Sequence, residues 1–154
     1  MLIIRQYQPV DKGSVRELHI QALEPTGAML PGGPWNDDDL SDISNHYLTN
    51  GGEFLVGVLD NRILCMGASK KKSDTAGEIK RMRVLPDFQR KGYGQLILDS
   101  LETKARKLGF TELYLDTTTK QIPAKNFYKK NGYQEIYRMV FAGLEIIFLE
   151  KHLA

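Results

Sequence analysis

The sequence predicts one α/β domain, residues 1–154, built on a mixed but mostly antiparallel twisted sheet of six to seven strands with about four flanking helices. Two observations favour this class. Segments rich in β-branched and aromatic residues alternate with segments of helical periodicity, and turn residues separate them. Within 78–116 a helical pattern lies between two strand patterns, which is typical of a βαβ unit with parallel strands.

Turn signals place most element boundaries. Asp60 and Asn61 form a hairpin signal between two strand-like runs, and Gly109 follows the helical pattern that ends near Leu108. Asp11 is a candidate cap for the first helix. The expected strands are 2–7, 53–60, 62–71, 76–84, 111–117, 133–141 and 144–151, and the expected helices are 11–23, 36–48, a segment from the glycine turn to Leu108, and 123–132.

Composition excludes several classes of protein. The 154 residues hold 21 basic and 19 acidic side chains, a balance of +2, which is too small for a protein that coats nucleic acid. Cys65 is the single cysteine, so the chain has no disulfide framework or cysteine metal cluster, and its three histidines are scattered. We expect no metal. The N-terminus is unlike a signal peptide and no apolar run is long enough for a membrane span, so we expect a cytoplasmic protein.

The stretch "QRKGYG", residues 89–94, has the composition of an anion site. It follows a strand and opens a helix, whose first amides have no acceptor within the helix and carry partial positive charge. Gly92 and Gly94 remove side chains that would block a ligand, while Arg90 and Lys91 add charge. The stretch therefore suits a pyrophosphate, with an ordinary glycine turn as the alternative reading.

Two motifs resemble those of the GNAT superfamily of N-acetyltransferases. Residues 89–94 match its acetyl-CoA signature, Q/R-x-x-G-x-G/A, and "AKNFYKKNGY" (124–133) matches its A-x-x-x-Y-x-x-x-G-F/Y helix. The order of elements fits this family over nearly the whole chain. The resemblance implies a β-bulge in strand 76–84 that splays the sheet and opens a slot. It implies acetyl-CoA as the co-substrate.

The resemblance also implies which residues hold acetyl-CoA. The pyrophosphate would lie on the backbone amides at the start of the helix, and the pantetheine arm would pair with the strand backbone at 82–84. The Met82 amide is the candidate donor to the oxyanion. Gln121 stands where many members of the family have asparagine. The implied cofactor-binding residues are Met82, Arg83, Val84, Gln89, Arg90, Lys91, Gly92, Tyr93, Gly94, Gln95, Gln121, Asn126 and Tyr128.

Tyr128 matches the tyrosine of the family's second motif. A phenol with a pKa of ~10 keeps its proton at neutral pH and can donate it to a departing thiolate. An attacking amine arrives protonated, so a carboxylate must accept its proton. Glu78 and Asp116 are both candidates for this base, and the residues do not decide between them.

The acceptor is expected to be a primary amine of a small molecule or a protein. Trp35, Asp39 and Asp42 lie in the region that shapes the acceptor side in this family, and the carboxylates would attract a cationic amine. The alternative is that these carboxylates only begin a helix. The predicted activity is direct acetyl transfer within a ternary complex, and a non-catalytic CoA-binding module is the alternative. We expect no nucleic-acid or membrane partner and leave open a homodimer.

Overall fold

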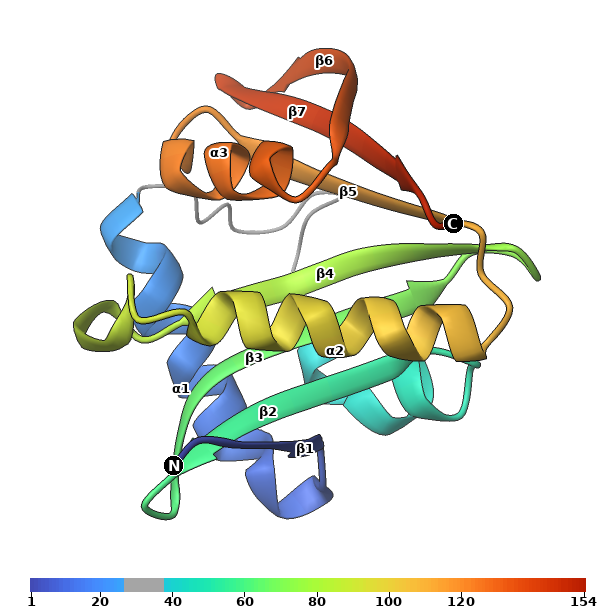
Figure 1. Cartoon of the computed structure of the whole chain (residues 1–154). Coiled ribbons are helices and arrows are strands. Elements are labelled where there is room, and N and C mark those ends of the chain that lie inside the picture. The colour runs from blue at the N-terminus through green and yellow to red at the C-terminus, as the bar shows by residue number, and fades with distance from the viewer. Residues whose placement is uncertain (27–37) are drawn as a thin grey trace.

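One seven-stranded sheet organises the molecule, in the strand order β1-β2-β3-β4-β5-β7-β6 (Figure 1). The structure is a computed structural model, and it describes residues 1–26 and 38–154. Among the described strands only β4 and β5 pair in parallel, so the predicted mixed, mostly antiparallel sheet is confirmed. The strands are β1 (Ile3–Gln6), β2 (Glu53–Leu59), β3 (Arg62–Lys71), β4 (Ala76–Val84), β5 (Glu112–Thr118), β6 (Gln134–Phe141) and β7 (Leu144–His152).

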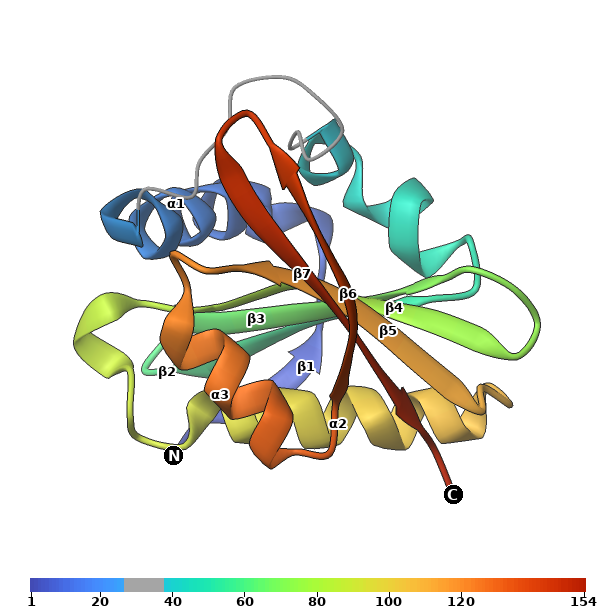
Figure 2. The ribbon, with the colours of Figure 1, turned by 90° about the horizontal axis from the view of Figure 1, so that it is seen from above.

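Helices cover both faces of the sheet (Figure 2). One face carries α2 and α3, and the other carries α1 with two short helical turns, η3 and η4. The α-helices are α1 (Lys12–Leu23), α2 (Tyr93–Lys107) and α3 (Ile122–Lys130); the 3₁₀ turns are η1 (Pro9–Asp11), η2 (Glu24–Thr26), η3 (Asp38–Ser41) and η5 (Pro86–Phe88), and η4 (Ser44–Leu48) is a π-helical turn.

Two local predictions need correction. The helix expected over 36–48 is two separate turns in its described part, η3 and η4, although its apolar residues Leu40, Ile43 and Tyr47 are buried. Asp11 directly precedes α1 but its side chain does not cap that helix. The carboxylate instead accepts two hydrogen bonds from Arg5, of 2.7 and 2.9 Å, and one from the Gln8 amide. A bidentate bond to a guanidinium is stronger than a neutral capping bond, which explains the difference.

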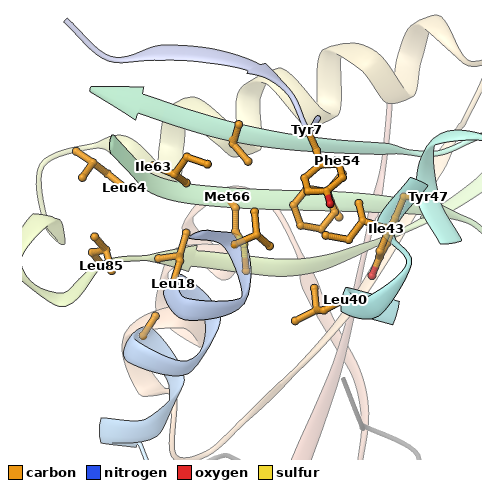
Figure 3. Packing of buried hydrophobic residues seen from close by; sticks show 14 residues of the cluster. Tyr7, Leu18, Leu40, Ile43, Tyr47, Phe54, Ile63, Leu64, Met66 and Leu85 are labelled. Carbon is orange, nitrogen blue, oxygen red and sulfur yellow. The ribbon is translucent and has the colours of Figure 1, made fainter. Parts of the chain in front are cut away.

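A hydrophobic core lies on each side of the sheet. On the α1 side, Leu18 packs with residues of η3, η4 and the strands, and the rings of Tyr47 and Phe54 meet edge to face with centroids 5.4 Å apart (Figure 3). On the other side, α2 buries Ile97, Leu98, Leu101 and Ala105 against the strands. This spacing is one face of an α-helix, as the sequence predicts. Packing on both faces therefore holds the sheet in place, and strands of this sheet carry the candidate site.

The sheet opens between its two parallel strands. β4 and β5 pair from Ala76 opposite Glu112 to Glu78 opposite Tyr114, and the pairing then ends (Figure 1). On the other side of β4, Lys80 pairs with Ala68 and Arg83 with Met66, so two residues of β4 oppose Gly67 alone. This is a β-bulge, a feature that bends a strand and increases its local twist. The predicted bulge and splay are confirmed.

Candidate active site

The glycine turn leads from the end of β4 into α2. Gly92 occupies the N-cap position of α2 with φ of +84°, a left-handed conformation that glycine adopts without steric cost. Arg90 is left-handed as well, with φ of +64°. The first backbone hydrogen bond of α2 runs from the Leu96 amide to the Gly92 carbonyl, so the amides before Leu96 have no acceptor within the helix. Because Gly92 has no side chain, it offers these amides no side-chain acceptor.

Gly94 lies in the first turn of α2 for a different reason. A Cβ built on it would lie 3.8 Å from Val84 Cγ2 and 4.0 Å from Phe127 Cζ, which are ordinary contacts. The chain's own packing therefore does not require glycine at this position. Because it has no side chain, Gly94 leaves open the space beside the first turn of α2 in the direction of Val84 and Phe127. The turn thus fits a diphosphate group bound at the helix start.

The side chains around this turn differ in their contacts and their exposure. Gln89 donates a 3.1 Å hydrogen bond to the Val84 carbonyl, and Tyr93 is half-buried against both cores. Arg90 and Lys91 are exposed, with Lys91 Nζ 6.0 Å from the centre of the Phe88 ring. These two residues are therefore the charged side chains nearest in sequence to the amides.

The end of β4 borders the opening in the sheet. Met82 and Val84 direct their side chains into the core beneath α2, and Arg83 Nη1 donates a 2.8 Å hydrogen bond to the Met82 carbonyl. Beyond Glu78, β4 is not paired with β5. The backbone of residues 82–84 therefore lies on a strand edge where an extended ligand arm can form hydrogen bonds.

Tyr128 projects from α3 into the core between the two helices. It is 6% exposed, and its ring meets those of Phe127 and Tyr133 edge to face at centroid distances of 5.2 and 5.7 Å. Burial raises the pKa of the phenol, the Asp116 carboxylate raises it further, and the Arg83 guanidinium lowers it. The net pKa is well above the ordinary value, so the phenol is a proton donor across the neutral range.

The two candidate bases share the face of the sheet that lies opposite α2. Glu78 pairs with Tyr114 across the parallel strands, and Asp116 is two residues after Tyr114, so the three side chains point to the same side. Glu78 lies 4.0 Å from Lys80 Nζ. Asp116 lies beyond the last paired position, beside the opening, and its charge acts on Tyr128.

Gln121 and Asn126 belong to the helix that carries Tyr128. Gln121 is the N-cap residue of α3, and its Oε1 accepts a 3.3 Å hydrogen bond from Thr118 Oγ1. Asn126 is exposed. Both residues therefore lie on the helix that follows β5, one of the two strands that border the opening.

The expected acceptor residues separate into three cases. Trp35 lies outside the described residues. Asp42 is exposed, and its carboxylate accepts a 2.9 Å hydrogen bond from Asn45. Asp39 is 12% exposed in its side chain and forms an ion pair with Arg81. The charge of Asp39 is thus already matched within the chain, whereas that of Asp42 faces solvent.

Sequence reasoning missed an aromatic pair next to Asp116. Asp116 pairs with Phe148 across β5 and β7, and Phe148 pairs with Tyr137 across β7 and β6. Residues opposite each other share a face, so these three side chains form a row. The rings of Tyr137 and Phe148 stack at 4.4 Å and 13°, and Tyr137 is 53% exposed. Only the register of three strands brings the row together, and no local motif marks it.

In the described part of the chain, no three His, Cys, Asp or Glu side chains gather closely enough to hold a metal ion. Within residues 1–26 and 38–154, no helix combines the length and the apolar character that a membrane crossing requires.

A known protein family matches most of this chain. The family model for the acetyltransferase (GNAT) family matches residues 14–133. Human N-acetyltransferase 8 is 26% identical over 121 residues, covering 70% of this chain and 53% of that protein. The chain spans about half the length of the curated relatives that it matches.

Solved structures share the fold over the whole chain. A GNAT-family acetyltransferase of Staphylococcus aureus Mu50 superposes with a TM-score of 0.88 at 21% identity, covering 100% of both chains. The PaiA N-acetyltransferase of Thermoplasma acidophilum, solved in complex with coenzyme A, superposes with a TM-score of 0.76 at 20% identity and covers 99% of both.

Proposed function

This chain belongs to the acetyltransferase (GNAT) family, and on that premise we propose that it transfers the acetyl group of acetyl-CoA to a primary amine. One arrangement carries the proposal. The first turn of α2 around Gly94 and the buried phenol of Tyr128 flank the stretch of β4 that does not pair with β5. A diphosphate site, an extended strand edge and a proton donor are the parts that a bound thioester cofactor would need.

Different groups of the site bind different parts of the cofactor. The first amides of α2 bind the diphosphate, with Arg90 and Lys91 adding positive charge. The backbone at Met82 and Val84 pairs with the pantetheine arm as a neighbouring strand would. Gln121 and Asn126 offer side-chain amides at the start of α3. When bound, acetyl-CoA supplies an activated acetyl group.

Two side chains transfer protons in this proposal, and one backbone amide stabilises the developing negative charge. A carboxylate, Glu78 or Asp116, accepts the proton of the incoming ammonium group, whose pKa of ~10.4 keeps it charged until then. The Met82 amide donates to the carbonyl oxygen as negative charge develops there. Tyr128 donates its phenolic proton to the leaving sulfur. Direct attack in a ternary complex requires only that these groups be held in place.

The acceptor is a primary amine that enters from the α1 side of the sheet, where Glu78 and Asp116 lie. Asp42 is exposed and can attract a cationic amine over a distance comparable to the Debye length, ~8 Å at physiological salt. Asp39 is held by Arg81, so recruitment rests on Asp42. The aromatic row beside Asp116 offers an apolar surface for the body of the acceptor.

The test is free-thiol release from acetyl-CoA with a panel of cationic, neutral and aromatic primary amines, with the acetylated product identified by mass spectrometry. We expect thiol release that depends on the amine and an equal amount of acetylated product. Thiol release without any amine product would show hydrolysis instead. Tight CoA binding by calorimetry without turnover of any amine would favour a non-catalytic CoA-binding module.

A further inference from the structure

Arg81 holds an unusual backbone conformation at the β-bulge. Its φ is +57°, in the left-handed region that residues with a side chain seldom adopt. Such a conformation costs on the order of 1–3 kcal/mol and persists only where the surroundings enforce it. Arg81 and Met82 are the two residues that oppose Gly67, so the strained residue directly precedes the candidate oxyanion donor.

The side chain of Arg81 is anchored on the α1 side of the sheet. Arg81 Nε donates to Asp39 Oδ2 at 2.9 Å, and Nη2 donates to Oδ1 at 2.5 Å. Tyr47, which is fully buried, donates its hydroxyl hydrogen to the same carboxylate. The guanidinium is therefore held by a bidentate bond to η3, and η3 is held by η4.

This network is ionic at neutral pH. Burial pushes the pKa of Asp39 upward, but the hydrogen bond and the charge of Arg81 and the hydroxyl of Tyr47 lower it by more, so that the net pKa lies below the ordinary value. The side chains of Arg81 and Asp39 are only 10% and 12% exposed. Removing one partner of such a pair leaves the other charge largely buried, which is costly.

Met82 is fixed from the opposite side. A Cβ on Gly67 would lie 2.4 Å from Met82 Sδ and 2.6 Å from Ile97 Cγ2, so the side chain of Met82 fills the space that glycine leaves. The peptide unit between Arg81 and Met82 is planar, and the backbone rotation at Arg81 therefore sets the direction of the Met82 N–H. The anchor at Arg81 and the contact at Gly67 together define that direction.

We propose that Arg81, held by Asp39 and Tyr47, is a positioning residue that aims the Met82 amide at the carbonyl oxygen of the thioester. The inference rests on the proposed acetyl transfer. It gives Asp39 a structural part in the reaction, in place of contact with the acceptor. It also makes η3, far away in sequence, a support for the oxyanion donor.

The test compares Arg81→Lys, Arg81→Gly and Asp39→Asn with the control Arg5→Lys. Arg5 of β1 and Asp11 of η1 form a similar bidentate pair, away from the opening. Arg81→Gly keeps the left-handed backbone accessible while removing the anchor. We expect kcat to fall about tenfold or more in the three test variants, because a misdirected donor loses part of its effect on the transition state. The dissociation constant of CoA, measured by calorimetry, should stay within about threefold, and Arg5→Lys should leave kcat unchanged.

A second measurement does not depend on activity. In protein labelled with ¹⁵N-methionine and free of ligand, the Met82 amide resonance should shift or broaden in the Arg81 and Asp39 variants and stay in place in Arg5→Lys. An unchanged Met82 resonance, or a kcat equal to that of the unmodified protein, would overturn the proposal. If the unmodified protein transfers no acetyl group, the proposed function fails, while the Met82 resonance still decides whether Arg81 directs that amide.

Discussion

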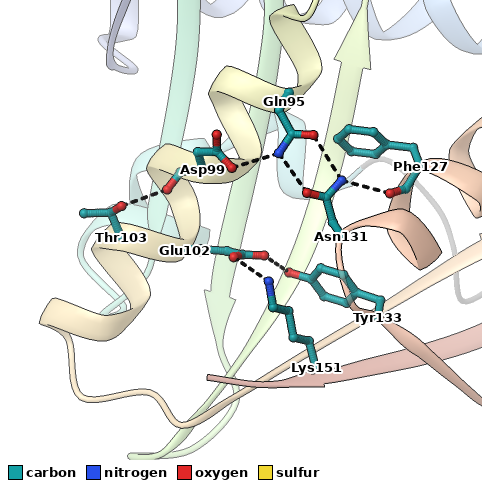
Figure 4. A network of polar contacts seen from close by, with 8 residues as sticks. All are labelled: Gln95, Asp99, Glu102, Thr103, Phe127, Asn131, Tyr133 and Lys151. Carbon is teal, nitrogen blue, oxygen red and sulfur yellow. Dashed lines mark hydrogen bonds and ion pairs between the residues drawn. The ribbon is translucent and has the colours of Figure 1, made fainter. Parts of the chain in front are cut away.

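Gln95 and Asn131 exchange two side-chain hydrogen bonds, of 2.8 and 3.1 Å, which join the first turn of α2 to the end of α3 (Figure 4). Asn131 also donates a 2.9 Å bond to the Phe127 carbonyl. The helix that would hold the diphosphate is thus tied to the helix that carries Tyr128. Their relative position is set by this pair and by the buried bond of 2.8 Å from Tyr133 to Glu102.

Replacing Asn131 with Ala should loosen this connection. Three hydrogen bonds of the Asn131 side chain are lost, two with Gln95 and one to the Phe127 carbonyl, and each contributes about 1 kcal/mol. For a chain of this size we expect a fall in Tm of about 6–12 °C, together with a lower kcat because Tyr128 is less well placed. Thermal unfolding and steady-state kinetics measure both. Asp99→Ala, which removes only a bond from Gln95 within α2, is the control and should change kcat little.

The two glycines of the turn should respond differently to alanine. Gly94→Ala should leave Tm nearly unchanged, because its Cβ meets only ordinary contacts, but should weaken CoA binding about tenfold if the diphosphate lies on these amides. Gly92→Ala should lower Tm, because φ of +84° costs a residue with a side chain about 1–2 kcal/mol. Calorimetry with CoA and thermal unfolding separate the two effects.

Gly143→Ala provides the matched control. Gly143 has φ of +77° in the turn between β6 and β7 and has open space around it. The Gly143→Ala variant should lose stability as Gly92→Ala does, and its affinity for CoA should stay unchanged. Unchanged CoA binding in Gly94→Ala and in the bulkier Gly94→Val would mean that residues 89–94 form an ordinary turn and do not bind the diphosphate.

Local motifs predicted the parts of the fold and site that depend on neighbours in sequence. The glycine turn and the helix around Tyr128 each fit within about ten residues, so their geometry follows from propensity and spacing. Asp39 could not be placed in this way, because its partner Arg81 is 42 residues away. The sequence suggested a helix start and an acceptor contact for Asp39. Its actual environment depends on how η3 packs against the bulge of β4.

Tyr128→Phe keeps the ring and removes the phenolic proton. We expect kcat to fall by ~10²-fold or more if the phenol is the general acid, with little change in the affinity for CoA. Because burial raises the pKa of Tyr128, the phenol stays protonated as the pH rises, and it should cause no alkaline loss of activity below pH ~10. The pH profile of kcat measures this. Turnover equal to that of the unmodified protein at every pH would leave Tyr128 a structural residue.

Glu78→Gln and Asp116→Asn should identify the base. A carboxylate that accepts the amine's proton must be ionised, so activity falls as the pH drops through its pKa, and removal of the true base abolishes that acidic limb of the kcat/KM profile. The amine's own titration is measured separately and subtracted. We expect one of the two variants to lose the limb and most of the rate. If both retained it, the base would be another group or a water.

The row formed by Asp116, Phe148 and Tyr137 predicts how the acceptor is bound. Tyr137 is half-exposed and stacked on Phe148, so its ring is a rigid apolar surface that can contact the acceptor at little cost in conformational entropy. Tyr137→Ala should raise KM for aromatic and long aliphatic amines by about three- to tenfold, because burial of apolar surface is worth ~25 cal/mol per Å². KM for acetyl-CoA should not change.

Val140→Ala is the control for Tyr137→Ala because it lies on the same exposed strand. Val140 is 69% exposed and pairs with Glu145, which places its side chain on the opposite face of β6 from Tyr137. It should leave KM for every amine unchanged. Amines without an apolar body should bind equally well to Tyr137→Ala and to the unmodified protein. An equal rise in KM for apolar and small polar amines would mean that Tyr137 supports the hairpin and does not contact the acceptor.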